Sequence, residues 1–214
     1  MSEHSYIEEK SLDKQSKSES LQDLKKICEQ MEKSVCKIKC ISKGHGTGFF
    51  CLIQNGWDFL RFLVTNYHVL PQKDIKKGNK IKFSMNNDKI NLEIYIDESR
   101  ITFANEKYDV TFIEIRPTDG IDKDSFLDID NDIFKDDYTY KDMPIYLLHY
   151  PKGEAIYKAS GLIQGLKENK FTLEHYCDSD FGSSGGPLIC LKNFKVIGVH
   201  KGGADQKIGI LEHY

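Results

Sequence analysis

Hydrophobic residues along most of this chain occur in short runs, each bounded by turn-forming or charged residues. The runs are four to eight residues long and rich in Val, Ile, Phe and Tyr, a pattern typical of β-strands. A first set covers 35–41, 48–53, 59–65, 80–84, 90–96, 101–104 and 110–115. A second set covers 144–149, 156–163, 171–176, 187–190, 195–200 and 207–211. Because no helical segment interrupts either set, the pattern predicts an all-β sandwich or barrel architecture.

A polar, acidic stretch separates the two sets. Nine aspartates fall within 118–142, and we expect this stretch to be a solvated linker. The alternating aspartates at 128–132 resemble a calcium-binding loop, but the Gly and Glu that such a loop needs at its sixth and twelfth positions are missing. The sequence therefore predicts a first barrel at about 35–116, a linker at about 117–141 and a second barrel at about 142–214.

The first 34 residues have a different pattern. Residues 1–18 are polar, and we expect them to form a tail. Apolar residues then recur at steps of three and four: Leu21, Leu24, Cys28 and Met31. This spacing predicts a short amphipathic helix from about Ser20 to Ser34. We expect its apolar stripe to pack on the β-rich body.

Composition and charge narrow the classes of function. The chain has 214 residues, of which 39% are hydrophobic, enough for two small barrels. With 30 basic and 33 acidic residues it has no general attraction for nucleic acid. No apolar run is long enough to cross a membrane and no secretory signal is visible, so we expect a cytoplasmic protein with free cysteine thiols. No metal or cofactor is predicted, and the oligomeric state is not indicated.

A glycine-rich segment at 182–187 is arranged to display a serine. Glycines on both sides of the serine pair allow a tight turn and close approach of a ligand. A serine hydroxyl is a poor nucleophile, so Ser184 would need a base and a group that orients the base. His68 follows one apolar strand and Asp109 directly precedes another. The order His, Asp, Ser on an all-β background predicts nucleophilic catalysis by Ser184.

On these motifs the chain resembles the chymotrypsin-like (trypsin-like, PA clan) serine peptidases, most nearly their disulfide-free intracellular and glutamyl-endopeptidase-like members. The resemblance covers about residues 35–211. Besides the serine motif, its markers are 46–50, 64–68, 109–110, 150–151 and 198–203. It implies an all-β fold of two six-stranded antiparallel Greek-key barrels, with a short N-terminal helix added.

The resemblance also implies a role for each site residue. Ser184 would attack the scissile carbonyl, His68 would carry its proton and Asp109 would orient the imidazole. The backbone amides of Gly182 and Ser184 would form the oxyanion hole. The partner would be an extended peptide or protein substrate, paired with 201–203 as an added strand. Ser183 stands where zymogen-forming relatives carry an Asp, which argues against activation by a new N-terminus.

Two interpretations of the specificity pocket are open. In the first, Ser179 and His200 line the pocket and select Glu or Gln before the cleaved bond (P1). In the second, Asp178 stands where trypsin carries the carboxylate that selects Lys or Arg. We favour Glu or Gln. Gly203 and Gly209 stand at positions that keep the pocket mouth open in this family.

A function of another class is also compatible with the pattern. A catalytically silent pair of barrels could bind an extended peptide without cutting it. The intact trio of His68, Asp109 and Ser184 favours the enzyme over this alternative.

Overall fold

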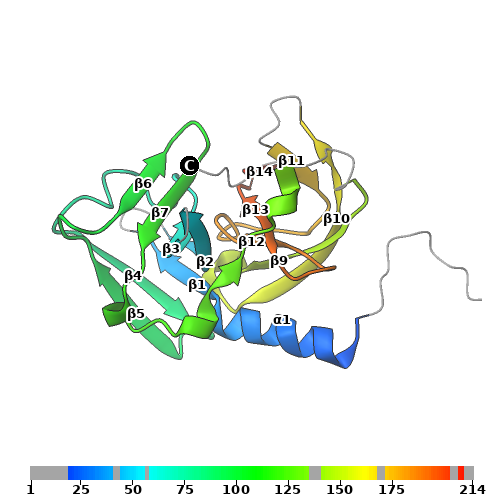
Figure 1. Cartoon of the computed structure of the whole chain (residues 1–214), viewed down its shortest axis with the longest axis horizontal. Helices are drawn as coiled ribbons and strands as arrows, with labels where there is room; N and C mark the ends of the chain where they lie inside the picture. The colour runs from blue at the N-terminus through cyan, green and yellow to red at the C-terminus, as the bar shows by residue number, and fades with distance from the viewer. Residues whose placement is uncertain are drawn as a thin grey trace, which may run out of the picture.

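The computed structural model describes residues 19–40, 44–55, 58–134, 141–167, 172–202 and 207–209. Two curled, mainly antiparallel sheets lie side by side, and helix α1 runs beneath them (Figure 1). Within the described residues, no helix combines the length and the apolar character that a membrane span needs. The predicted all-β class is confirmed.

All seven runs of the first set are strands of one sheet. They are β1 (Val35–Lys39), β2 (His45–Asn55), β3 (Asp58–Thr65), β4 (Lys80–Met85), β5 (Ile90–Tyr95), β6 (Thr102–Asn105) and β7 (Val110–Glu114). Neighbours pair antiparallel in the order β5-β4-β1-β2-β3-β7-β6. A short strand, β8 (Leu127–Asp128), pairs parallel with β2. The sheet therefore has eight strands where six were expected for a barrel, seven from the first set and one from the linker.

The second set forms a closed barrel of six strands. They are β9 (Pro144–His149), β10 (Tyr157–Leu166), β11 (Thr172–His175), β12 (Pro187–Cys190), β13 (Val196–His200) and β14 (Lys207–Gly209). The order around the barrel is β10-β11-β14-β13-β12-β9, and every pair is antiparallel. Closure leaves this barrel without a free strand edge, which protects it from pairing with another chain.

The hydrophobic core has three parts. One cluster fills the first sheet around Ile38 and Phe50, and a second fills the barrel around Leu147 and Leu188. The third joins the two halves and includes Tyr146, which is fully buried. The strands β1, β2 and β9 thus have both faces buried, because alternate residues point into the core of one sheet and into the core between the two sheets.

Helix α1 (Leu21–Lys33) is capped by Ser20 and Ser34, the two residues expected from the sequence to bound it. Ser20 and Asp23 form a capping box, which satisfies amide groups that the first turn leaves unpaired. The predicted apolar stripe is wrong, because Leu21, Leu24 and Cys28 are exposed.

The helix is instead held by a face that includes a polar residue. Ile27 is buried in the core cluster between the sheets and Met31 packs against that cluster. Gln30 is buried between them, donates to the backbone oxygen of Phe194 at 3.2 Å and accepts from the hydroxyl of Tyr146 at 2.5 Å. A search for apolar spacing overlooks this face, since glutamine counts as polar.

The expected linker is more ordered than a solvated connection. Its short 3₁₀ turns are η1 (Pro117–Asp119), η2 (Lys123–Ser125) and η3 (Asn131–Phe134), and a further turn, η5 (Pro151–Gly153), follows β9. Asp119 makes a buried, two-pronged ion pair with Arg100, and Asp130 accepts from the side chain of Asn193 at 3.0 Å. These aspartates therefore tie the connection to both halves of the molecule.

Candidate active site

The structure brings the three predicted catalytic residues to one cavity. His68 lies in the turn that follows β3, and Asp109 lies directly before β7, so both come from the first sheet. Ser184 lies in the turn before β12, in the second barrel. A cavity of about 480 Å³ is lined by His68 and Ser184 together with Gly182, Ser179 and His200. Residues from both halves thus share one site.

His68 and Asp109 are firmly paired. The Nδ1 atom of His68 lies 2.8 Å from Oδ2 of Asp109 and 3.1 Å from Oδ1. Oδ1 also accepts from the backbone amide of His68 at 2.9 Å, and Asn66 donates to the backbone oxygen of Asp109 at 2.9 Å. Because an ionised carboxylate can only accept, Nδ1 of His68 carries the hydrogen. Its Nε2 is left as an acceptor on the side of the ring away from Asp109.

Ser184 is placed by its backbone. Its carbonyl oxygen accepts from the amide of Thr47 at 2.8 Å, and the next amide, of Gly185, donates to the oxygen of His200 at 2.8 Å. The hydroxyl donates to the backbone oxygen of Lys201 at 3.3 Å. Within the described residues it makes no hydrogen bond to His68, and such bonds are often loose before substrate binds.

Two backbone amides at this turn are unpaired. Among the described residues, the amides of Gly182 and Ser184 donate to no protein acceptor, and both residues line the cavity. Gly182 has a φ of 90°, which favours glycine, and its carbonyl oxygen accepts from the hydroxyl of Thr47 at 2.8 Å. A pair of free amides beside a serine hydroxyl is the arrangement that stabilises an oxyanion.

Ser183 anchors the same turn from its buried side. Its hydroxyl accepts from the amide of Asp180 at 3.0 Å and shares a hydrogen bond with Nδ1 of His149 at 2.7 Å. Burial lowers the pKa of His149 to about 4, so its imidazole stays neutral near pH 7. Ser183 stands where zymogen-forming relatives carry an aspartate. At this position the protein therefore has a hydrogen bond between a serine and a neutral histidine.

One residue that lines the cavity, His200, contacts a second buried histidine, His175. His200 is fully buried, and its Nδ1 lies 3.2 Å from Nε2 of His175. Nδ1 of His175 accepts from the amide of Cys177 at 3.0 Å, so in the neutral ring Nε2 carries the hydrogen and donates to His200. Neutral His200 must then carry its own hydrogen on Nε2. That atom is buried and has no hydrogen-bond partner among the described residues.

The other predicted pocket residues are distributed differently. Asp178 is exposed and lines a separate cavity of about 410 Å³ beside His149. Ser179 lines both this cavity and the one that holds Ser184. Gly209 belongs to β14 and pairs with Val199, whereas Gly203 lies outside the described residues.

Several neighbours of the site were not expected from the sequence. They are Thr47, His149 and His175, and the side chain of Lys201, whose backbone alone was expected at the site. The ammonium of Lys201 lies 3.9 Å from Oδ2 of Asp109, the oxygen that His68 contacts. Thr47 belongs to a glycine-flanked motif that the sequence did single out, so this signal was available. The two histidines carry no local signal, because their contacts join strands that are distant along the chain.

The free energy of unfolding is expected to fall as the pH is lowered from about 6.5 to 4. Burial lowers the pKa of His149 and His175 to about 4 and that of His200 to about 3, against an ordinary 6.5. Between these values the unfolded chain binds protons that the folded chain does not, and each such histidine contributes a slope of about 1.4 kcal/mol per pH unit. Urea unfolding at pH 7, 6 and 5 measures this slope.

The variant His149→Gln is the matched comparison for this acid sensitivity. It is expected to reduce the slope by about one third, because one of three proton-binding groups is removed. A free energy of unfolding that stayed constant or rose between pH 7 and 5 would contradict the assignment of three neutral histidines.

Comparison with known proteins places the chain in a family. A model of the trypsin-like peptidase domain matches residues 46–199, a range that contains His68, Asp109 and Ser184. No curated protein sequence matches the chain significantly.

Solved structures share the fold at low sequence identity. The serine endoprotease from Yersinia pestis has a TM-score of 0.61 at 15% identity, over 91% of this chain and 62% of that one. Deg5 has a TM-score of 0.61 at 21% identity, over 88% of both chains. The Rv3671c protease from M. tuberculosis, active form, has a TM-score of 0.58 at 22% identity, over 86% of this chain and 78% of that one.

These likenesses show the fold, and the domain match shows the family. The match covers less than two thirds of the length of the Yersinia chain. The predicted subtype, close to glutamyl endopeptidases, stays a prediction. The chain belongs to the trypsin-like peptidase family and is a serine-type peptidase with the chymotrypsin-like fold.

Proposed function

We propose that this protein is an endopeptidase that cuts extended peptide or protein substrates through Ser184, His68 and Asp109. The observation that carries the proposal is the pairing of His68 with the buried carboxylate of Asp109, which leaves Nε2 of His68 as an acceptor in the cavity that Ser184 also lines. An acceptor imidazole beside a serine hydroxyl is the arrangement for general-base catalysis.

The proposed reaction proceeds by acyl transfer. Oγ of Ser184 bonds to the scissile carbonyl carbon while its proton moves to Nε2 of His68. The carbonyl oxygen takes the negative charge and accepts from the amides of Gly182 and Ser184. His68 then donates its proton to the leaving amine as the C–N bond breaks. Water repeats the same steps on the acyl-enzyme, and Asp109 keeps the charged imidazole oriented throughout.

We further propose Glu or Gln as the residue before the cut. The hydrogen on Nε2 of His200 has no acceptor in the part of the chain that the structure describes, and Ser179 lines the same cavity. A side-chain amide or carboxylate oxygen of the substrate would satisfy this buried donor, which otherwise carries an energetic penalty. Asp178 is exposed and lines a different cavity, so it does not support a preference for Lys or Arg.

Active-site labelling tests the catalytic assignment. A fluorophosphonate probe is expected to form an adduct with the wild-type protein and none with Ser184→Ala. Circular dichroism of the variant checks that it folds. Absence of adduct on both folded proteins would contradict the proposal and favour a peptide-binding module without catalysis.

A peptide library varied at the residue before the cut tests the pocket. We expect cleavage after Glu or Gln, and His200→Leu is expected to lower kcat/KM for these substrates about 10- to 100-fold, since a buried hydrogen bond is lost. Asp178→Asn is the matched control and is expected to leave the profile unchanged. Cleavage restricted to Lys and Arg would refute the assignment of His200.

A further inference from the structure

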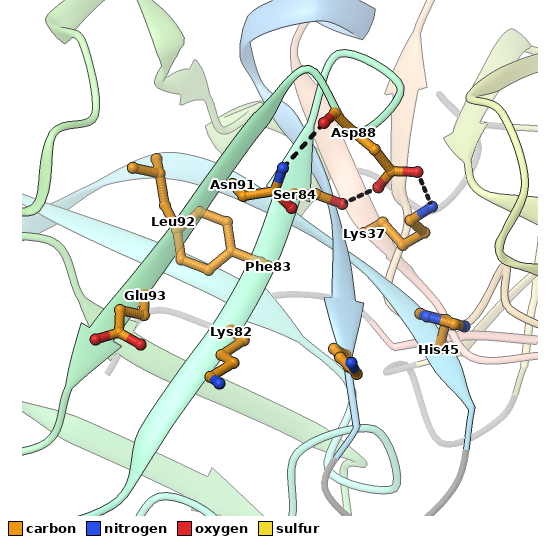
Figure 2. A pocket seen from close by; sticks show the side chains of 10 residues that line it. Lys37, His45, Lys82, Phe83, Ser84, Asp88, Asn91, Leu92 and Glu93 are labelled. Atoms are coloured by element: carbon orange, nitrogen blue, oxygen red, sulfur yellow. Dashed lines mark hydrogen bonds and ion pairs between the residues drawn. The ribbon is translucent and has the colours of Figure 1, made fainter.

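A second cavity, of about 600 Å³, lies on the first sheet. It is formed by residues of β1, β2, β4 and β5 and of the turn between β4 and β5 (Figure 2). His45 lines both this cavity and the one that contains Ser184. The two cavities are therefore adjacent, with His45 between them.

The strand register sets a row of charged residues across this surface. His45 on β2 is the direct partner of Lys39 on β1, and Lys39 is the direct partner of Lys82 on β4. Lys82 in turn is opposite Glu93 on β5. Because directly paired residues point to the same side of a sheet, these four side chains share one face. The row leads from the active-site cavity outward.

Lys39 and Lys82 are a like-charge pair. Both side chains are exposed, and neither makes an ion pair with another described residue. Like charges directly opposite each other on neighbouring strands are destabilising. Glu93 offsets them only in part, because its carboxylate is bonded to Lys80 at 2.5 Å, and this bond, with smaller contributions from Lys80 and Lys82 charge, holds its pKa below the usual range.

The inner wall of the cavity is charged but already compensated. Nζ of Lys37 lies 2.6 Å from Oδ2 of Asp88 and donates to the backbone oxygen of Gly153 at 3.0 Å. Ser84 donates to the other oxygen of Asp88, and Figure 2 shows these three side chains joined at one end of the cavity. Of the three lysines that line this cavity, Lys39 and Lys82 are therefore the two whose ammonium groups have no anionic partner among the described residues.

We propose that Lys39 and Lys82 bind a carboxylate side chain in the part of the substrate that follows the cleaved bond. The proposal rests on the proposed peptidase function. The active-site cavity is lined by His200, Ser179 and Gly202 from the second half of the molecule and by His45 and Cys40 from the first half. Under the proposed function the residues of the second half, which include the proposed pocket, contact the acyl half of the substrate. The part of the substrate that follows the cleaved bond, which is released with a new amino group, would then extend past His45 and over the row of charged residues.

The spacing of the row fits an extended peptide. Neighbouring strands lie about 4.8 Å apart, so Lys39 and Lys82 lie about 5 and 10 Å beyond His45 along the row. An extended chain advances about 3.3 Å per residue and covers this distance in two to three residues. The expected preference is for Asp or Glu within about the second to fifth residue after the cut.

Matched peptides test this surface. Two substrates share the residues up to the cut and differ after it, one with two glutamates and the other with two glutamines at the third and fourth positions. We expect kcat/KM to be about three- to tenfold higher for the glutamate peptide at low ionic strength, and the ratio to fall with added salt. The double variant Lys39→Gln/Lys82→Gln is expected to bring the ratio to about one.

The matched control is the double variant Lys192→Gln/Lys195→Gln, which removes two exposed lysines from the turn between β12 and β13. It is expected to keep the preference. If the wild-type protein cleaves both peptides normally and the ratio of their kcat/KM values is one, the proposed role of Lys39 and Lys82 is overturned and the proposed function is unaffected.

A binding measurement separates the two proposals if no cleavage occurs. Fluorescence anisotropy of both peptides with the Ser184→Ala protein needs no turnover. If the glutamate peptide binds more tightly, and this difference is lost when Lys39→Gln/Lys82→Gln is added, the proposed role of the two lysines is supported even if catalysis fails. Equal affinity for both peptides overturns it.

Discussion

Asp109→Asn is expected to lower kcat/KM for peptide hydrolysis about 10⁴-fold while the protein stays folded. Oδ1 of Asp109 accepts from the backbone amide of His68 at 2.9 Å, so in asparagine the amide oxygen keeps this position. The NH₂ group then faces Nδ1 of His68, where Oδ2 lies at 2.8 Å. A donor at this position forces the imidazole hydrogen onto Nε2. His68 can then no longer accept the proton of Ser184.

The backbone allows this substitution without strain. Asp109 has a φ of 56°, a left-handed conformation that asparagine adopts as readily as aspartate. The measurement is kcat/KM with the best library substrate, together with thermal unfolding. Asp128→Asn, at an exposed position on β8, is the control and is expected to change kcat/KM less than about twofold. An Asp109→Asn protein that kept a tenth of the activity would exclude the proposed role.

Gly185→Ala is expected to destabilise the protein by about 4 kcal/mol or more, or to prevent folding. A Cβ atom at this position would lie 2.0 Å from the backbone oxygen of Thr47 and 2.3 Å from Oγ1 of Thr65. Thr65 already donates to that same oxygen at 2.7 Å, and both threonines are buried. The neighbours therefore have no room to move. Urea unfolding or the soluble yield measures the effect.

Gly78 provides a control with the same φ angle. Both glycines have a φ of 90°, but a Cβ atom on Gly78 would have no atom within 4 Å. Gly78→Ala therefore isolates the cost of the left-handed backbone, which is about 1–2 kcal/mol. Equal destabilisation by the two substitutions would show that the contact with Thr47 is not tight.

Local patterns in the sequence predicted the strands well. Alternation and turn residues depend on neighbouring positions, so both sets of runs became strands and α1 is capped by the expected serines. The helix stripe failed because Gln30 is buried through its hydrogen bonds to Tyr146 and Phe194. Those partners are more than 100 positions away, and no local rule includes them.

In the candidate site, too, residues in local motifs could be predicted and contacts between distant strands could not. His68, Asp109 and Ser184 stand in local motifs and could be selected from the sequence. The contact of His175 with His200 depends on the order β11-β14-β13 in the barrel, and the pairing of Lys39 with Lys82 depends on the register between β1 and β4. Register between distant strands is a property of the folded sheet, so these contacts could not be found before the fold was known, although His200 itself was selected from the sequence.

The closed barrel also sets an order of events during synthesis. All strands of the path that positions His68 and Asp109 lie before residue 115, so this half can fold while the rest of the chain is still being made. The barrel that positions Ser184 closes only when β14 (Lys207–Gly209) reaches β11 and β13. Under the proposed mechanism Ser184 and His68 therefore come together only after β14 has been made, and a nascent chain is expected to be unable to cut its neighbours before then.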